Sequence, residues 1–143
     1  MARDSFVQFE PLWEQQVLGL SEPFLEEAAA IVEEGQKRRI PVSRDGSHGR
    51  ERGYARDQIH VERGRDAIGP YRDIGSDAES PDGYPYPLGL ETGTVPHDIT
   101  AKGDYPLRSK DGRVFGKTVH HPGTKPMPWC VPALADLAGR VFQ

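Results

Sequence analysis

The side chains best suited to chemistry lie in the last third of the sequence. His97, His120 and His121 could join Glu91 as metal ligands, because imidazole and carboxylate are usual ligands of zinc. His120 and His121 are adjacent, however, and neighbouring side chains on a strand point to opposite faces. The sequence also has no His-Glu-x-x-His and no His-x-His pair. We therefore expect no metal here and interpret these histidines as hydrogen-bond partners of backbone groups in tight turns.

Covalent catalysis has little support in this sequence. Cys130 could act as a nucleophile only with a helper histidine, and its apolar neighbours Trp129 and Val131 favour a buried, unreactive thiol. No serine lies in a nucleophile-elbow sequence, and the glycine-rich patterns that hold dinucleotides or phosphates are absent. We therefore expect a protein that is not an enzyme, with no catalytic residue and no cofactor.

Two glycine–threonine turns are the most distinctive features of the chain. Gly93 can take a positive φ, and the nearby Glu91 carboxylate can accept hydrogen bonds from threonine hydroxyls and backbone amides. Pro122-Gly123 is the residue pair of a type II turn. Such turns give a shaped surface that suits repeated subunit contacts, although a monomer could also use them simply as well-formed turns. The predicted interface residues are Glu91, Gly93, Thr94, His97, His121, Pro122, Gly123 and Thr124.

Charge is unevenly distributed along the chain. Residues 10–34 contain seven Glu and no Lys or Arg, whereas residues 36–65 contain nine Lys or Arg against four Asp or Glu. A solvated acidic helix followed by a solvated basic loop would explain this. Alternatively, the acidic helix of one subunit faces the basic segment of the next, or the basic segment lines a channel for DNA. Arg50, Arg52 and Arg56 are the candidate residues for these last two roles.

Length and composition indicate one domain with a modest core. The chain has 143 residues, of which 36% are hydrophobic, together with 16 Gly and 13 Pro. A small core must therefore carry long loops, and contacts with neighbouring subunits would add stability. No apolar run approaches the length of a membrane helix, and the N-terminus lacks a signal-peptide layout. The single cysteine excludes an internal disulfide, so we expect assembly in a reducing cytoplasm, without a membrane partner.

Helical signals dominate the first 40 residues. The sequence predicts a short helix around residues 12–18 that ends at Gly19, followed by a longer helix that begins at Ser21 as N-cap and runs to about Lys37. Ile40-Pro41 should end this helix, because the residue before proline avoids the helical region. Apolar residues share one face of the longer helix, and we expect Phe24, Ile31, Val32 and the distant Trp129 to be in the core.

The remainder of the chain predicts short strands and loops. Residues 43–56 are charged and glycine-rich, which is typical of a long flexible loop. Pro85 and Pro87 count against a regular helix over residues 84–90, and Asp111-Gly112 predicts a hairpin turn. Strands are predicted over 58–61, 67–74, 99–102, 106–108 and 113–120, and a final helix from about Pro132.

The predicted fold class is α+β, with an antiparallel sheet packed against one long N-terminal helix, a long loop between that helix and the sheet, and a short C-terminal helix. We expect a single domain over residues 1–143, in which residues 1–20 form an N-terminal extension.

The run from Tyr86 to Thr94, which ends in L-E-T-G-T and continues as Val95-Pro96-His97, resembles a signature of tailed-phage neck or tail-completion proteins related to the lambda Z protein. A second signature of this head–tail joining family is similar to residues 115–128, where His121-Pro122-Gly123-Thr124 occurs. Residues 53–59 resemble an upstream segment of the family, with Ala55 in place of a larger apolar residue and Gln58 in place of serine.

The resemblance covers about residues 21–140 and implies a non-enzymatic virion protein at the head–tail junction. It implies a ring of six or twelve identical copies around the DNA channel, assembled in the host cytoplasm. Its partners would be head-completion or connector proteins, tail terminator or tail tube proteins, and genomic DNA bound without sequence specificity. The alternatives are a tail terminator that caps the tube and, more remotely, a small nucleic-acid-binding module or a hydrolase.

Overall fold

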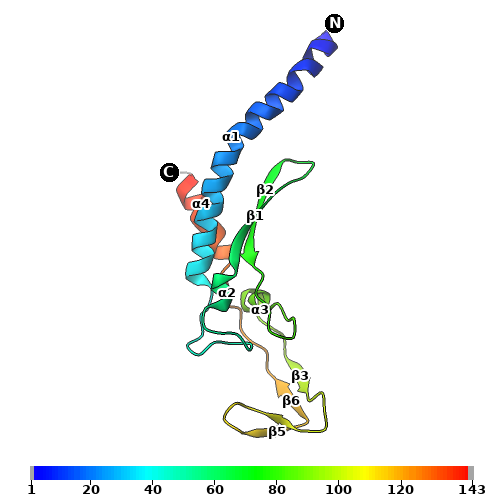
Figure 1. Ribbon diagram of the computed structural model, residues 1–143, viewed down its shortest axis with the longest axis vertical. Helices are drawn as coiled ribbons and strands as arrows, with labels where there is room; N and C mark the ends of the chain where they lie inside the picture. Colours follow the sequence, from blue (N-terminus) through cyan, green and yellow to red (C-terminus); the bar gives the residue numbers. More distant parts are fainter. Residues whose placement is uncertain (1, 142–143) are drawn as a thin grey trace.

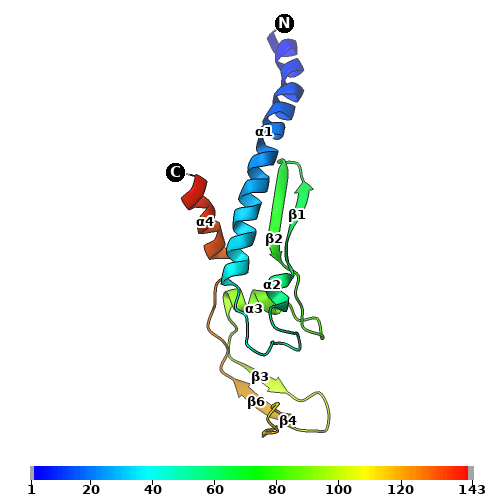
Figure 2. The same ribbon diagram turned by 60° about the vertical axis from the view of Figure 1, so that its left-hand side comes forward.

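The computed structural model describes the backbone of residues 2–141 and the side chains of residues 21–140. Helices and antiparallel strands are both present, which confirms the predicted α+β class. In Figures 1 and 2 the molecule is elongated, with α1 projecting at one end and the short strands β3 to β6 at the other. The elements are α1 (Ala2–Arg39), α2 (Tyr54–Asp57), β1 (Ile59–Arg65), β2 (Pro70–Ser76), α3 (Tyr86–Thr92), β3 (His97–Thr100), β4 (Leu107–Arg108), β5 (Val114–Gly116), β6 (Thr118–His121) and α4 (Val131–Val141).

The N-terminal region is one continuous helix. The prediction of two helices separated at Gly19, with Ser21 as an N-cap, was wrong, because α1 runs through both residues. A glycine costs only about 1 kcal/mol relative to alanine in a helix, which the good helix formers around Gly19 can offset. The predicted end of the helix is confirmed, since the Ile40 N–H donates to the Gln36 carbonyl at 2.9 Å and Pro41 follows.

The hairpin of β1 and β2 packs against α1 (Figure 2). Ile59 is buried and Val61 half-buried, on one face of β1, as the alternation of the sequence predicted. Arg63 and Arg72 lie directly opposite each other on the same face. Both guanidinium groups pair with Glu26 of α1, with Arg63 Nη2 at 2.8 Å from Glu26 Oε2, so opposite charges hold the hairpin to the helix.

The strands do not form one sheet. They form three separate antiparallel pairs, β1–β2, β3–β6 and β4–β5, and only the first packs on α1, which corrects the prediction of a single sheet. The strands of the other two pairs have two to four residues each, too few to extend a ladder across the glycines and prolines between them. The predicted turn at Asp111-Gly112 is confirmed, because the Ser109 N–H donates to the Arg113 carbonyl at 3.0 Å and closes the β4–β5 hairpin.

Two short helices complete the fold. α4 packs beside α1, where Arg39 donates to both carboxylate oxygens of Asp136 at 2.6 and 2.8 Å. α3 forms although two prolines were expected to oppose it. Pro85 is its N-cap and Pro87 lies in its first turn, where a helix needs no intrahelical N–H donor.

A small buried cluster joins these elements at the C-terminal end of α1. Its members come from α2, β1, α3 and the segments that follow α1, follow β2 and precede α4, and are Ile40, Ala55, Ile59, Ala78, Tyr86 and Trp129. Val32 is also buried, as predicted, and Ile31 is half-buried, but Phe24 is 52% exposed and does not belong to the core. Within residues 2–141, no helix has the length and hydropathy that a membrane span requires.

Candidate functional site

The two glycine–threonine turns lie against each other. Thr94 and Thr124 form an antiparallel bridge in which each N–H donates to the other carbonyl at 3.1 Å, and their hydroxyl oxygens are 3.0 Å apart. Gly93 and Gly123 have φ values of +71° and +81°. A Cβ on Gly93 would lie 2.6 Å from the Thr124 carbonyl oxygen, and one on Gly123 would overlap the Thr94 carbonyl oxygen. Only glycine therefore permits this close crossing of the two turns.

The β3–β6 pair continues from this bridge and brings two predicted histidines together. His97 and His121 are directly opposite, and their rings stack with centroids 5.1 Å apart. His97 Nδ1 lies 2.8 Å from the Val95 carbonyl oxygen, and His121 Nδ1 accepts the Gly123 N–H at 3.0 Å. The prediction that these histidines bond to turn backbone is confirmed. His120 instead pairs with Asp98, at 2.9 Å.

The bridge and the stacked histidines border a cleft of about 370 Å³. Four predicted interface residues contribute to it, and most of its other lining is aromatic or aliphatic. Its lining consists of His48, Tyr84, Tyr86, Gly89, Leu90, Thr94, His97, Ile99, His121, Thr124 and Met127. An apolar cleft of this size can accept a small molecule or a large side chain of a partner.

His48 is the histidine of the cleft that the sequence did not indicate. It comes from the charged loop far upstream, has a φ of +52°, and stacks its ring on Tyr86 at 4.6 Å. A non-glycine residue adopts such a φ rarely, and here the stacking supplies a compensating contact. Nothing in the spacing of the sequence links this histidine to Tyr86. Of the two tyrosines in the cleft, Tyr86 is buried and Tyr84 is exposed.

Glu91 lies apart from the cleft and holds α4 in place. Its carboxylate accepts the N–H groups of Trp129, Cys130 and Val131 at 2.6, 2.8 and 3.0 Å. Burial alone would raise the pKa of Glu91, but these donors lower it below its ordinary value. Accepting backbone amides was predicted, whereas the predicted bonds from threonine hydroxyls do not occur at this carboxylate. Glu91 therefore caps the N-terminus of α4.

Cys130 follows in the same segment. Its thiol is half-buried and accepts a hydrogen bond from Gln36 Nε2 at 3.3 Å. Burial, and then the charge of Glu91, raise the pKa of this thiol. A raised pKa leaves little thiolate at neutral pH, so the group is poorly suited to nucleophilic attack.

The three candidate arginines have different surroundings. Arg50 donates to the Glu79 carbonyl at 2.7 Å and lies 4.8 Å from the ring centre of Tyr54, so it holds the 43–53 segment to the core. Arg56 pairs with the neighbouring Asp57 at 3.0 Å. Arg52 is exposed and forms no ion pair with any residue whose side chain is described. Of the three, Arg52 is the most available to a partner.

The site is therefore a shaped, mainly apolar depression between two rigid turns and a histidine pair, with its glycines fixing the backbone. Comparison with known proteins adds no relative. No family model matches the chain, and no curated protein or solved structure shows significant similarity to it.

Proposed function

We propose that this protein is a structural subunit of the head–tail junction of a tailed phage. Six or twelve copies form a ring around the DNA channel, and the ring joins the capsid connector to the tail tube. The sequence signatures at the two glycine–threonine turns motivate the proposal. The structural observation that supports it best is the amount of apolar surface that a single copy leaves uncovered.

Large apolar side chains are exposed far from the core. Ile68 at the tip of the β1–β2 hairpin is 97% exposed, Tyr105 is 82% exposed and Val95 is 77% exposed. Single exposed apolar residues are normal on a monomer, so the support lies in their number. Fourteen large apolar side chains among residues 21–140 are exposed, and contacts with neighbouring subunits would cover them.

The elongated shape supports the same proposal. The first half of α1 extends beyond the β1–β2 hairpin, while β3 to β6 project from the opposite end of the molecule (Figure 1). Both projections are available for contacts with other subunits. The cleft lies at the base of the second projection, where the stacked His97 and His121 meet the Thr94–Thr124 bridge.

The first test is the mass of the purified chain in solution, alone and after mixing with phage head and tail fractions. A ring of six or twelve copies, or a monomer that joins heads or tails, supports the proposal. Joining tails alone would favour a tail terminator that caps the tube. A stable monomer that joins neither fraction would contradict both roles.

A second test separates a structural role from hydrolysis. Replacing both His97 and His121 with Ala removes the ring pair beside the cleft. If the protein is structural, virion assembly falls and neither the wild type nor the variant turns over ester or phosphoester substrates. Turnover by the wild type that the variant loses would favour the hydrolase alternative.

A further inference from the structure

The β1–β2 hairpin has two faces that carry opposite charge. On the face toward α1, Arg63 lies opposite Arg72, and glutamates of α1 neutralise this like-charged pair. On the outer face, Glu62 lies directly opposite Asp73, and Asp77 follows the end of β2. Like charges that face each other across a ladder destabilise a hairpin unless a counter-charge is present.

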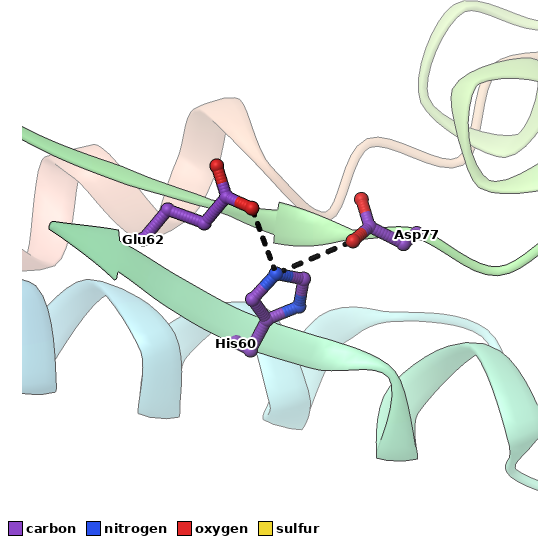
Figure 3. A group of neighbouring side chains, drawn as sticks. All are labelled: His60, Glu62 and Asp77. Atoms are coloured by element: carbon purple, nitrogen blue, oxygen red, sulfur yellow. Dashed lines mark ion pairs between the residues drawn. The ribbon is translucent and has the colours of Figure 1, made fainter. Parts of the chain in front are cut away.

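No lysine or arginine forms an ion pair with these outer carboxylates among residues 21–140. The imidazole of His60 faces two of them, with Nε2 at 3.3 Å from Asp77 Oδ2 and 3.7 Å from Glu62 Oε1 (Figure 3). The ligand atoms of these three side chains all lie within 4.8 Å of one another.

The orientation of His60 suits metal binding. Its Nδ1 lies 3.0 Å from the Gln58 carbonyl oxygen, so Nδ1–H donates to the backbone. This bond leaves Nε2 as the ring nitrogen nearest the two carboxylates, and metal-binding histidines commonly have their other ring nitrogen bonded to a backbone carbonyl in this way. The acceptor is the backbone carbonyl of Gln58, directly before β1, so none of the three ligands is used for this bond.

The spacing and the room around the group also fit a small cation. Zinc–nitrogen and zinc–oxygen bonds of about 2.0–2.1 Å place neighbouring ligands of a tetrahedral site about 3.4 Å apart. The separations of 3.3 and 3.7 Å from Nε2 bracket this value. Directly across the ladder from His60 lies Gly75, and a Cβ there would meet no atom within 4 Å, so water can complete the coordination.

We propose that His60, Glu62 and Asp77 bind one divalent transition-metal ion of the zinc class. The imidazole ligand favours such an ion over magnesium or calcium, which prefer oxygen ligands alone. The ion joins β1 to the segment that leaves β2 and offsets the charge of two outer carboxylates, as Glu22 and Glu26 offset the two arginines of the inner face. The site is independent of ring formation and of the cleft.

The test is titration of the purified chain with zinc chloride by calorimetry, in a non-coordinating buffer at pH 8. We expect about one ion per chain and a shift of the His60 ring signals in an NMR spectrum. His60→Gln and Asp77→Asn should each weaken binding at least tenfold. His120→Gln is the matched control, because His120 is an exposed histidine paired with a single carboxylate, that of Asp98.

Three outcomes would overturn the proposal. The wild type could fail to bind zinc at millimolar concentration, His60→Gln could bind as tightly as the wild type, or His97→Gln could abolish binding in place of His60→Gln. Circular dichroism of each variant shows whether it is folded, and the exposed positions of these side chains favour folding. Because the readout is metal binding, failure of the head–tail proposal would not affect it.

Discussion

At the scale of single residues, the prediction for Glu91 was correct about the kind of hydrogen bond that its carboxylate accepts but not about the donors. The sequence indicated that its carboxylate would accept backbone amides near its own turn. In the structure, the amides that it accepts are nearly forty residues away, at the start of α4. Local spacing identifies a residue with unusual bonding capacity, but only the tertiary fold determines its partner.

We predict that Glu91→Gln destabilises the protein by about 1–2 kcal/mol, because the neutral amide is a weaker acceptor for the three N–H groups that begin α4. Urea unfolding measures the difference in free energy. Glu34→Gln is the control, since Glu34 forms only a long exposed contact with Arg38 and should change stability by less than about 0.5 kcal/mol. Equal effects of the two variants would show that Glu91 does not hold α4.

We also predict that Cys130 reacts slowly with iodoacetamide in the folded protein at pH 7.5. Its half-buried position and raised pKa reduce both access and thiolate. The rate of alkylation, monitored by mass spectrometry, should become at least tenfold faster in 6 M urea. Rapid labelling of the folded protein would mean that the Gln36 and Trp129 region opens readily.

At the scale of elements, the acidic stretch and the basic stretch of the sequence meet within one chain. Arg63 and Arg65 of the basic stretch pair with Glu26 and Glu22 of α1. Arg72, just beyond that stretch, pairs with both glutamates. The uneven charge that suggested contacts between subunits is thus partly satisfied inside the subunit. Arg52 and the other exposed charges are left for external partners.

This pairing predicts a specific loss of stability in acid. Hydrogen bonding from Arg63, followed by that from Arg72, lowers the pKa of Glu26 from 4.5 to about 2. Because the folded pKa is the lower one, the stabilisation is fully present above pH 4.5 and is lost as the pH falls towards 2. Unfolding measured at intervals from pH 5 to 2 should show a shallower decline for Glu26→Gln than for the wild type. Parallel curves would contradict the assignment.

The close crossing of the two glycine–threonine turns predicts that a side chain at Gly123 weakens the Thr94–Thr124 bridge. Gly123→Ala places a Cβ against the Thr94 carbonyl at a positive φ, so the bridge should weaken by about 1 kcal/mol or more. Hydrogen exchange of the Thr94 and Thr124 amides should then accelerate about fivefold or more. Gly103→Ala is the control, because its Cβ meets nothing within 4 Å. Unchanged exchange in Gly123→Ala would show that the turns relax easily.

At the scale of the whole molecule, most features with a local cause were predictable, with the unbroken α1 and the helix α3 as exceptions, and features with a distant cause were not. The helix end at Ile40-Pro41, the Asp111-Gly112 turn and the positive φ of Gly93 each depend on a few neighbouring residues, and all were predicted. The separation of the strands into three pairs was not predicted, because it depends on which strands pack against α1 and which do not.

Long-range contacts also account for the errors at the site. The contact of His48 with Tyr86 depends on how the charged loop folds back, and no local pattern in the sequence encodes it. Phe24 lies on the apolar face of its helix, yet no element covers that part of α1 enough to bury it. A helical pattern identifies a face, but the partner that covers the face comes from elsewhere in the chain.

The pairing of α1 with α4 has a consequence for how the chain is made. Arg39 and Asp136 are 97 positions apart, and Gln36 and Cys130 are 94 apart. Contacts of such high sequence separation close large loops and form late in folding. On the ribosome, α1 is made before α4, so this packing cannot form until residues 131–141 have been added. Firm association between copies is therefore best timed after α4 has been made.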